Sequence, residues 1–167
     1  PDAATPAPIV EAGIAALRAG FTHYTPALGL PALRAAIAEF YWSRYGVAVN
    51  PERVVVTTGS SAALLLAIGV LINPGEAVLL SDPGYPCNRN FLRFVDAQAC
   101  AVPVGPESSY QITPAHVTQY WTALTRAALV ASPANPTGMV LSLPDLQALY
   151  GAIASRSGSL IVDEIYH

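Results

Sequence analysis

The sequence has 167 residues, enough for one domain with a sizeable core or for one piece of a larger domain. Hydrophobic residues make up 53% of it and charged residues only 11%, against roughly 25% charged residues in an ordinary soluble domain. So little charge cannot cover the whole surface, and we expect further polypeptide, a partner subunit or both to cover part of it. The net charge of −3 and the scattered basic residues argue against nucleic acid as a partner.

Other classes of protein are disfavoured as well. The longest apolar run, AALLLAIGVLI, has 11 residues, fewer than the 18 or so that a membrane-spanning helix needs. No segment resembles a signal peptide. Cys87 and Cys100 lack the spacing of a metal site, so we expect no metal and a reduced, cytoplasmic protein. All eight basic residues are arginine, and the sequence contains no lysine.

The first elements in chain order are two helices. Apolar residues at helical spacing predict them over residues 8–19 and 30–45, with Pro31 suited to a first turn. Between them lies a loop punctuated by proline and glycine, FTHYTPALG, which carries Tyr24. Short apolar and β-branched runs then predict buried strands at 54–58, 77–81, 99–104, 128–132 and 159–164. The runs between these strands are helical in pattern, at 60–72, 86–95, 114–124 and 143–155.

This alternation of strands and helices indicates the fold class. It predicts an α/β protein with a mainly parallel sheet and helices on both faces, a three-layer α/β/α arrangement. Ligands of such sheets gather at the carboxyl ends of the strands. Four loops directly after predicted strands are distinctive: TTGSS, SDPGYP, SPANPTG and DEIYH. Because the sequence stops just beyond a strand, we expect it to be a fragment.

The first two of these loops offer an anion site and an aromatic plane. Gly59 allows close backbone approach, and Ser60 and Ser61 begin a helix whose free N–H groups favour an anion. Alternatively, Ser60 caps that helix, and both roles can hold at once. Tyr85 lies on a turn stiffened by two prolines, where its ring could lie flat against a planar ligand or pack in the core.

The last two loops carry an amide, a carboxylate and a phenol. Asn135 lies between two prolines that restrict the backbone, so it presents a rigid amide at the end of a strand, unless the segment is an ordinary turn. Asp163 ends an apolar strand, where an unpaired carboxylate would be costly, so we expect it to face a cation or strong donors. Tyr166 follows closely and could point into the same cleft or serve in packing.

Five motifs in this order carry a resemblance that covers nearly the whole sequence: YTPALGLPALRAAIAEFY, TTGSSAAL, DPGYP, SPANPTG and VDEIYH. Together they resemble the fold-type-I, class I and II pyridoxal-phosphate-dependent aminotransferases. The resemblance implies that residues 1–167 form an incomplete cofactor-binding large domain of the pyridoxal-phosphate transferase type. It also implies an enzyme that transfers an amino group between an amino acid and a 2-keto acid through Schiff-base intermediates.

The resemblance assigns roles to the residues that would meet the cofactor ring. Asp163 matches the aspartate that keeps the pyridine nitrogen protonated through a charge-assisted hydrogen bond. Asn135 and Tyr166 match the residues that hydrogen-bond the phenolic oxygen of the ring. Tyr85 matches the aromatic residue that stacks on it.

The resemblance also assigns the cofactor's phosphate group. Ser60 and Ser61, behind Gly59, match the phosphate seat at a helix N-terminus. Tyr24 matches a tyrosine that reaches the phosphate held by the neighbouring subunit, which implies a homodimer with shared active sites. The alternative for Tyr24 is a loop residue without a ligand.

The sequence also departs from the family pattern. The family's Schiff-base lysine and substrate-carboxylate arginine belong to positions after residue 167, and its amino-terminal arm belongs before residue 1. Ala62 stands where many members carry a polar side chain. Three other hypotheses stay open. The protein could be a C–S lyase or β-lyase of the same fold, which performs β-elimination or another lyase reaction. It could also be the ligand-sensing domain of a transcriptional regulator, or an inactive scaffold.

Overall fold

The computed structural model describes residues 3–166, which divide into two compact units, one up to Thr57 and the other from Thr58 on. The first unit contains α1 (Ala7–Arg18), α2 (Pro31–Tyr45) and the short 3-10 helix η1 (Pro51–Arg53). The expectation of one partial cofactor-binding domain over residues 1–167 stays a prediction. The ends of that range, Pro1, Asp2 and His167, lie outside the described residues.

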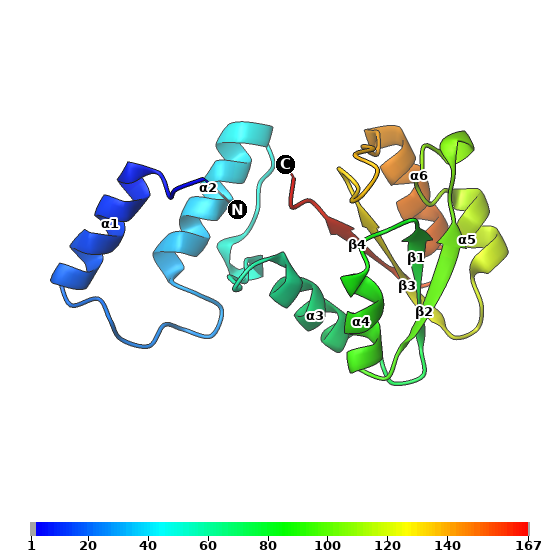
Figure 1. The fold of residues 1–167 in the computed structure, drawn as a ribbon, viewed down its shortest axis with the longest axis horizontal. Coiled ribbons are helices and arrows are strands. Elements are labelled where there is room, and N and C mark those ends of the chain that lie inside the picture. The colour runs from blue at the N-terminus through cyan, green and yellow to red at the C-terminus, as the bar shows by residue number, and fades with distance from the viewer. Residues whose placement is uncertain (1–2, 167) are drawn as a thin grey trace. The chain divides into compact units, whose positions relative to one another are not determined.

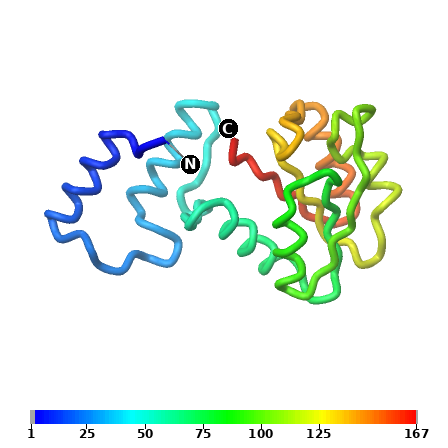
Figure 2. The backbone as a smooth tube through the Cα atoms, viewed as in Figure 1, coloured from blue at the N-terminus to red at the C-terminus, as the bar shows by residue number. Residues whose placement is uncertain are grey.

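Both predicted helices of the first unit are present. Pro31 occupies the first turn of α2, as expected, and Gly46 ends the helix in the left-handed conformation with a φ of 67°. The segment between α1 and α2 runs as an arc without helix or strand (Figure 2). Arg34 ties α2 to the following segment, because its Nε donates to the carbonyl oxygens of Pro51 at 3.0 Å and Val54 at 2.9 Å.

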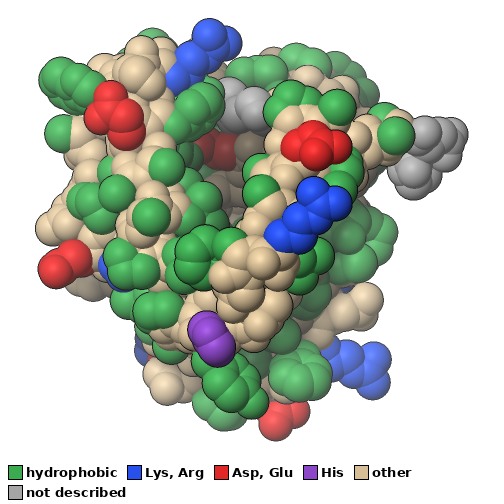
Figure 3. Space-filling view, turned by 90° about the vertical axis from the view of Figure 1, so that its left-hand side faces the viewer, with side chains coloured by type: hydrophobic (Ala, Val, Ile, Leu, Met, Phe, Trp, Pro, Cys, Tyr) green, Lys and Arg blue, Asp and Glu red, His purple; other side chains and the backbone are tan. Residues whose placement is uncertain are grey.

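The first unit exposes much apolar surface. α1 has no buried residue, and α2 buries Ala38 alone among its residues. Figure 3 shows a face of the molecule on which hydrophobic side chains are widespread and charged ones are sparse. The exposed large apolar residues of α2 and the arc before it include Phe21, Leu28, Leu30, Leu33, Phe40, Trp42 and Tyr45. This exposure agrees with the low charge of the sequence.

The second unit is built on a parallel sheet of four strands in the order β2-β1-β3-β4 (Figure 1). The strands are β1 (Ala77–Asp82), β2 (Gln98–Pro103), β3 (Thr125–Ala131) and β4 (Ser159–Asp163). The inner strands β1 and β3 each contain four consecutive buried residues. Continuous burial is typical of parallel strands covered on both faces, so the prediction of buried strands is confirmed for this inner pair.

Two helices cover each face of this sheet. On one face, α3 (Ser60–Leu71) and α4 (Cys87–Phe94) pack on β1 and β3 through Leu64, Ile68, Val78, Leu80, Leu92 and Leu129. On the other, α5 (Pro114–Tyr120) and α6 (Leu143–Ala154) pack through Leu79, Val102, Val117, Val130, Leu149 and Ile153. A short 3-10 helix, η2 (Pro106–Ser108), precedes α5. The predicted fold class, a parallel sheet between two helical layers, is confirmed.

One predicted strand and one predicted helix end are wrong. Residues 54–58 form no strand, because a strand needs a partner and Val56 donates only to the carbonyl of Leu28, at 3.0 Å, rather than to a neighbouring ladder. The helix predicted over 114–124 ends at Tyr120, since Trp121 is extended with φ −73° and ψ 124°. β3 correspondingly begins at Thr125 instead of residue 128.

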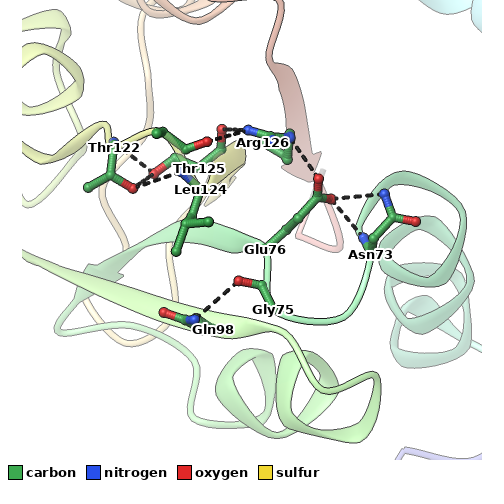
Figure 4. Close-up of polar contacts among 9 residues, drawn as sticks. Asn73, Gly75, Glu76, Gln98, Thr122, Leu124, Thr125 and Arg126 are labelled. Carbon is green, nitrogen blue, oxygen red and sulfur yellow. Dashed lines mark hydrogen bonds and ion pairs between the residues drawn. The ribbon is translucent and has the colours of Figure 1, made fainter.

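A polar network joins the amino ends of β1 and β3 (Figure 4). The Glu76 carboxylate accepts from the Asn73 backbone N–H at 2.8 Å and from Arg126 Nε at 2.7 Å. Arg126 also donates to the carbonyl of Ala123 at 2.8 Å. The Asn73 backbone N–H, then the Asn73 side chain and then the Arg126 charge hold the pKa of Glu76 below its ordinary value of 4.5, although burial acts in the opposite direction.

Several features are absent from residues 3–166. No helix in this range is long and apolar enough to cross a membrane. Likewise, no group of three or more His, Cys, Asp or Glu side chains in it could hold a metal ion. Cys87 and Cys100 are free thiols, and burial raises the pKa of Cys100, which favours its protonated form.

We predict that Glu76→Gln lowers the thermal midpoint of the complete protein by a few degrees at neutral pH, and that this difference shrinks as the pH falls below about 4.5. A carboxyl whose pKa is depressed by folding stabilises the fold above its unfolded pKa and loses that contribution as it becomes protonated. Thermal unfolding from pH 3 to 7 measures the difference, with the exposed Glu39→Gln as control. A difference that stays constant across this range would contradict the prediction.

Candidate functional site

The site begins at the amino end of α3. Gly59 precedes the helix with φ 90° and ψ 168°, a conformation open essentially to glycine, and Ser60 is the first helical residue. No side chain caps the helix, so the alternative in which Ser60 acts as its cap is wrong. The first-turn N–H groups have no acceptors within the helix and carry its positive end. This terminus therefore favours an anionic group.

The turn after β1 presents Tyr85. Gly84 is required for close packing there, because a Cβ at this position would clash with the backbone carbonyl oxygen of Ser81. Asp82 and Arg89 bracket the turn with an ion pair of 2.9 Å between Oδ1 and Nη2, each side chain being half exposed. Such an exposed pair contributes little to stability, so we attribute the shape of the turn mainly to the close approach at Gly84.

The Tyr85 hydroxyl lies among other polar side chains. The Cys87 side chain, through its hydrogen bond and its charge, raises the pKa of the Tyr85 phenol above the ordinary value of 10.0. Burial and Tyr166 add to this effect, whereas a hydrogen bond with Ser61 acts against it. Tyr85 therefore stays neutral at physiological pH and offers a phenol rather than a charge.

Asp163 and the end of β3 are brought together by strand pairing. Ala131 and Asp163 are register partners in β3 and β4, and the Ser132 N–H donates to the carbonyl of Asp163 at 3.0 Å. The Asp163 carboxylate is half-buried, and its Oδ1 accepts from the backbone N–H of Ile165 at 3.1 Å. This bond fixes the carboxylate orientation at the carboxyl edge of the sheet.

Asn135 lies in the loop that follows β3. The loop is closed internally, since the Ala134 N–H donates to the carbonyl of Met139 at 2.8 Å and the Gly138 N–H to that of Ala134 at 2.7 Å. The peptide bonds that precede Pro133 and Pro136 are both cis. Asn135 is half-buried within this closed loop. The predicted rigid presentation of its amide thus has a physical basis in the loop's own hydrogen bonds.

These segments surround one hollow of about 160 Å³. Its lining residues are Ser60, Ser61, Tyr85, Ala131, Asn135, Asp163, Ile165 and Tyr166. Of the predicted site residues, Gly59 adjoins the hollow as the residue before α3, while Tyr24 belongs to the other compact unit and is fully exposed. The structure therefore brings six of the predicted side chains together, and their roles stay predictions.

Size alone does not identify this hollow as the site. A larger one, of about 270 Å³, lies beside η2 and the start of α6 and includes Glu107 and Asp145. Another of about 270 Å³ adjoins the site itself and shares Asn135 and Tyr166 with it. We favour the smaller hollow because it alone among these three combines a helix amino end, an aromatic ring and a carboxylate at the carboxyl edge of the sheet.

Some residues that support the site were not predicted from the sequence. Cys87 directly follows the DPGYP motif, so its place near Tyr85 could have been inferred from that position. Ile165 contributes the backbone N–H that orients Asp163. Gln111 and Ser132 hold the Asn135 loop at its base. Nothing in the local sequence indicates the part that Gln111 plays.

Comparisons with known proteins identify a family. The family described as "Aminotransferase class I and II" matches residues 1–167. The valine–pyruvate aminotransferase of Mycobacterium tuberculosis is 41% identical over 167 residues, which is all of this chain and 43% of that protein. The arginine–pyruvate transaminase of Pseudomonas aeruginosa is 38% identical over 166 residues, or 99% of this chain and 42% of that protein. The chain thus spans less than half the length of these curated relatives.

Solved structures agree with the sequence comparisons. A crystal structure of an aminotransferase from Mycobacterium tuberculosis matches with a TM-score of 0.95 at 40% identity, covering 100% of this chain and 45% of that one. The aspartate aminotransferase from Thermus thermophilus with maleate matches with a TM-score of 0.93 at 35% identity, covering 99% of this chain and 44% of that one. The resemblance carried by the five sequence motifs is confirmed.

We predict that Gly84→Ala destabilises the complete protein by about 1–3 kcal/mol, because the added Cβ would press on the backbone carbonyl of Ser81. The matched control is Gly151→Ala in α6, where a Cβ meets nothing within 4 Å and helix propensity favours alanine. Urea unfolding of both variants measures the effect. Equal stability of the two variants would show that the turn before Tyr85 adapts without cost.

Proposed function

Since this chain belongs to the class I and II aminotransferase family, we propose that the complete protein is a pyridoxal-phosphate-dependent aminotransferase. It would transfer an amino group between an amino acid and a 2-keto acid. The observation that carries the proposal is the convergence of Ser60, Ser61, Tyr85, Asn135, Asp163 and Tyr166 on one hollow at the carboxyl edge of the sheet.

The donor set of this hollow fits pyridoxal phosphate. The amino end of α3, with the hydroxyls of Ser60 and Ser61, suits a phosphate group, and Gly59 leaves the backbone accessible there. The Tyr85 ring suits the planar pyridine face. When bound, the cofactor supplies an electron sink for reactions at the substrate Cα.

Asp163 would meet the opposite end of the cofactor from the phosphate. Its carboxylate, oriented by the Ile165 N–H, would accept a charge-assisted hydrogen bond from the pyridine nitrogen and so hold the proton on that atom. Asn135 and Tyr166 would donate to the phenolic oxygen of the ring. Both residues also line the adjoining hollow, which suits a substrate next to the ring.

The substrate class follows from the relatives. The two named above act on valine with pyruvate and on arginine with pyruvate, so pyruvate is the keto acid to test first. Residues 1–167 contain no lysine, and the amine that links covalently to the cofactor would therefore come from elsewhere in the complete protein. We place this protein in the cytoplasm as a homodimer whose subunits share active sites, with Tyr24 reaching the partner's phosphate seat.

Product analysis tests the proposed function. The complete protein is incubated with pyridoxal phosphate, pyruvate and a panel of single amino acids, and alanine formation is followed by mass spectrometry. Alanine together with the matching keto acid supports the proposal. Release of ammonia or a thiol instead would indicate a lyase of the same fold, and binding of an amino acid without any turnover would favour a ligand-sensing regulator or an inactive scaffold.

We predict that Asp163→Asn in the complete protein lowers kcat by at least about a hundredfold while weakening cofactor binding by less than about tenfold, because it removes a charge and keeps the shape. Single-turnover kinetics and a fluorescence titration with pyridoxal phosphate measure the two effects. The exposed Asp96→Asn, in the turn between α4 and β2, is the matched control. Unchanged proton abstraction from the substrate Cα would assign Asp163 a structural role.

A second prediction concerns the shared site. Tyr24→Ala and Asp163→Asn subunits, each impaired alone, should regain about a quarter of wild-type activity when refolded together, because half of the dimers are mixed and each mixed dimer contains one intact site. Tags on the two variants confirm that mixed dimers form. If such dimers are no more active than the average of their parents, Tyr24 serves its own subunit or no ligand at all.

A further inference from the structure

The loop that carries Asn135 is held at its base by a side chain from another part of the fold. Gln111 lies between η2 and α5, and only 4% of it is exposed. Its Nε2 donates to the carbonyl of Ala131 at 3.1 Å and to that of Met139 at 3.2 Å. Ala131 ends β3, and Met139 follows the loop. One amide group therefore bridges the two ends of the segment that presents Asn135.

A second link reinforces the same base. The Ser132 hydroxyl, in a residue only 6% exposed, accepts from the backbone N–H of Leu141 at 3.0 Å. The Ser132 N–H donates to the carbonyl of Asp163. The base of the loop is thus joined both to the chain after it and to the strand that carries Asp163.

We propose that Gln111 is a positioning residue for Asn135. It does not line the hollow, so it would act through the loop and not by contact with a ligand. The consequence for the cofactor rests on the proposed function, in which Asn135 addresses the ring. We call the two hydrogen bonds from Gln111 to the ends of the loop the clamp, and the clamp does not depend on the proposed function.

The chemistry of the side chain supports this assignment. A primary amide offers two N–H donors on one nitrogen, which is what two nearby carbonyl oxygens require. A side chain without donors would remove this bond from the Ala131 carbonyl and leave the Met139 carbonyl with the Ala134 N–H as its remaining donor. Gln111→Leu is similar in size and removes both bonds. Gln111→Asn keeps the donors on a side chain too short to reach both carbonyls.

Hydrogen exchange in the complete protein without cofactor tests the clamp. The amides of Ala134 and Gly138, which close the loop, should exchange at least about tenfold faster in Gln111→Leu, whereas amides of β1 should not change. Gln111→Asn should give a smaller effect in the same direction, and it decides the question if Gln111→Leu does not fold. The exposed Gln119→Leu in α5 should leave the loop unchanged. Unchanged exchange at Ala134 and Gly138 in the folded Gln111 variants would overturn the proposal.

A double-mutant cycle tests whether the clamp acts through Asn135. Gln111→Leu, or Gln111→Asn in its place, should weaken pyridoxal phosphate binding by about tenfold when Asn135 is present and by less than about twofold in the Asn135→Ala background. An equal loss in both backgrounds would show general support of the fold and overturn the positioning role. Failure of the wild-type protein to bind pyridoxal phosphate would refute the proposed function instead, and the exchange measurement would still decide the clamp.

Discussion

The parallel pairing of β3 with β4 is the contact on which the candidate site depends. It places Ala131 opposite Asp163 and continues one residue further through the bond from the Ser132 N–H to the Asp163 carbonyl. The loop with Asn135 and the carboxylate of Asp163 thereby leave the sheet side by side. A slip of one residue in this register would turn Asp163 to the other face of the sheet, so the packing of the buried β3 and the half-buried β4 also fixes the chemistry at their ends.

The sequence predicted the layers well because burial in a parallel sheet leaves a local signature. The apolar runs of β1 and β3 are continuous, and helices alternate with the strands along the chain. Residues 54–58 have the same local composition and form no strand, since pairing is a property of two segments and cannot be read from one. α5 ends early because of polar contacts just after it. The Thr122 N–H donates to Thr125 Oγ1 at 3.0 Å, and the hydroxyl groups of the two threonines are hydrogen-bonded at 3.1 Å. These bonds compete with the hydrogen bonds that would continue the helix.

The site residues were predictable to the extent that they follow strands. Tyr85, Asn135 and Asp163 stand in a loop or at a strand end on the carboxyl edge, where parallel topology gathers them. Ser60 also lines the hollow, but it begins α3 after residues 54–58, which form no strand. Gln111 is different, because its partners are backbone carbonyls 20 and 28 residues further along the chain. A backbone carbonyl has the same chemistry whatever its side chain, so no pattern of residue types reports such a bond. Support of a functional loop from outside it is therefore visible only in the fold.

The electrostatic polarity of the hollow explains why a ligand of one particular kind suits it. The amino end of α3 contributes a positive potential on one side, and the Asp163 carboxylate contributes a negative charge from β4. Tyr85 lines the same hollow and stays neutral, because Cys87 and burial raise the pKa of its phenol. A flat molecule with an anionic group at one end and a protonated nitrogen at the other is favoured in one orientation and opposed in the reverse one. In the proposed function, this polarity would orient the ligand before any hydrogen bond to Asn135 or Tyr166 is made, and the rigidity of the Asn135 loop would then decide how closely that bond can be formed.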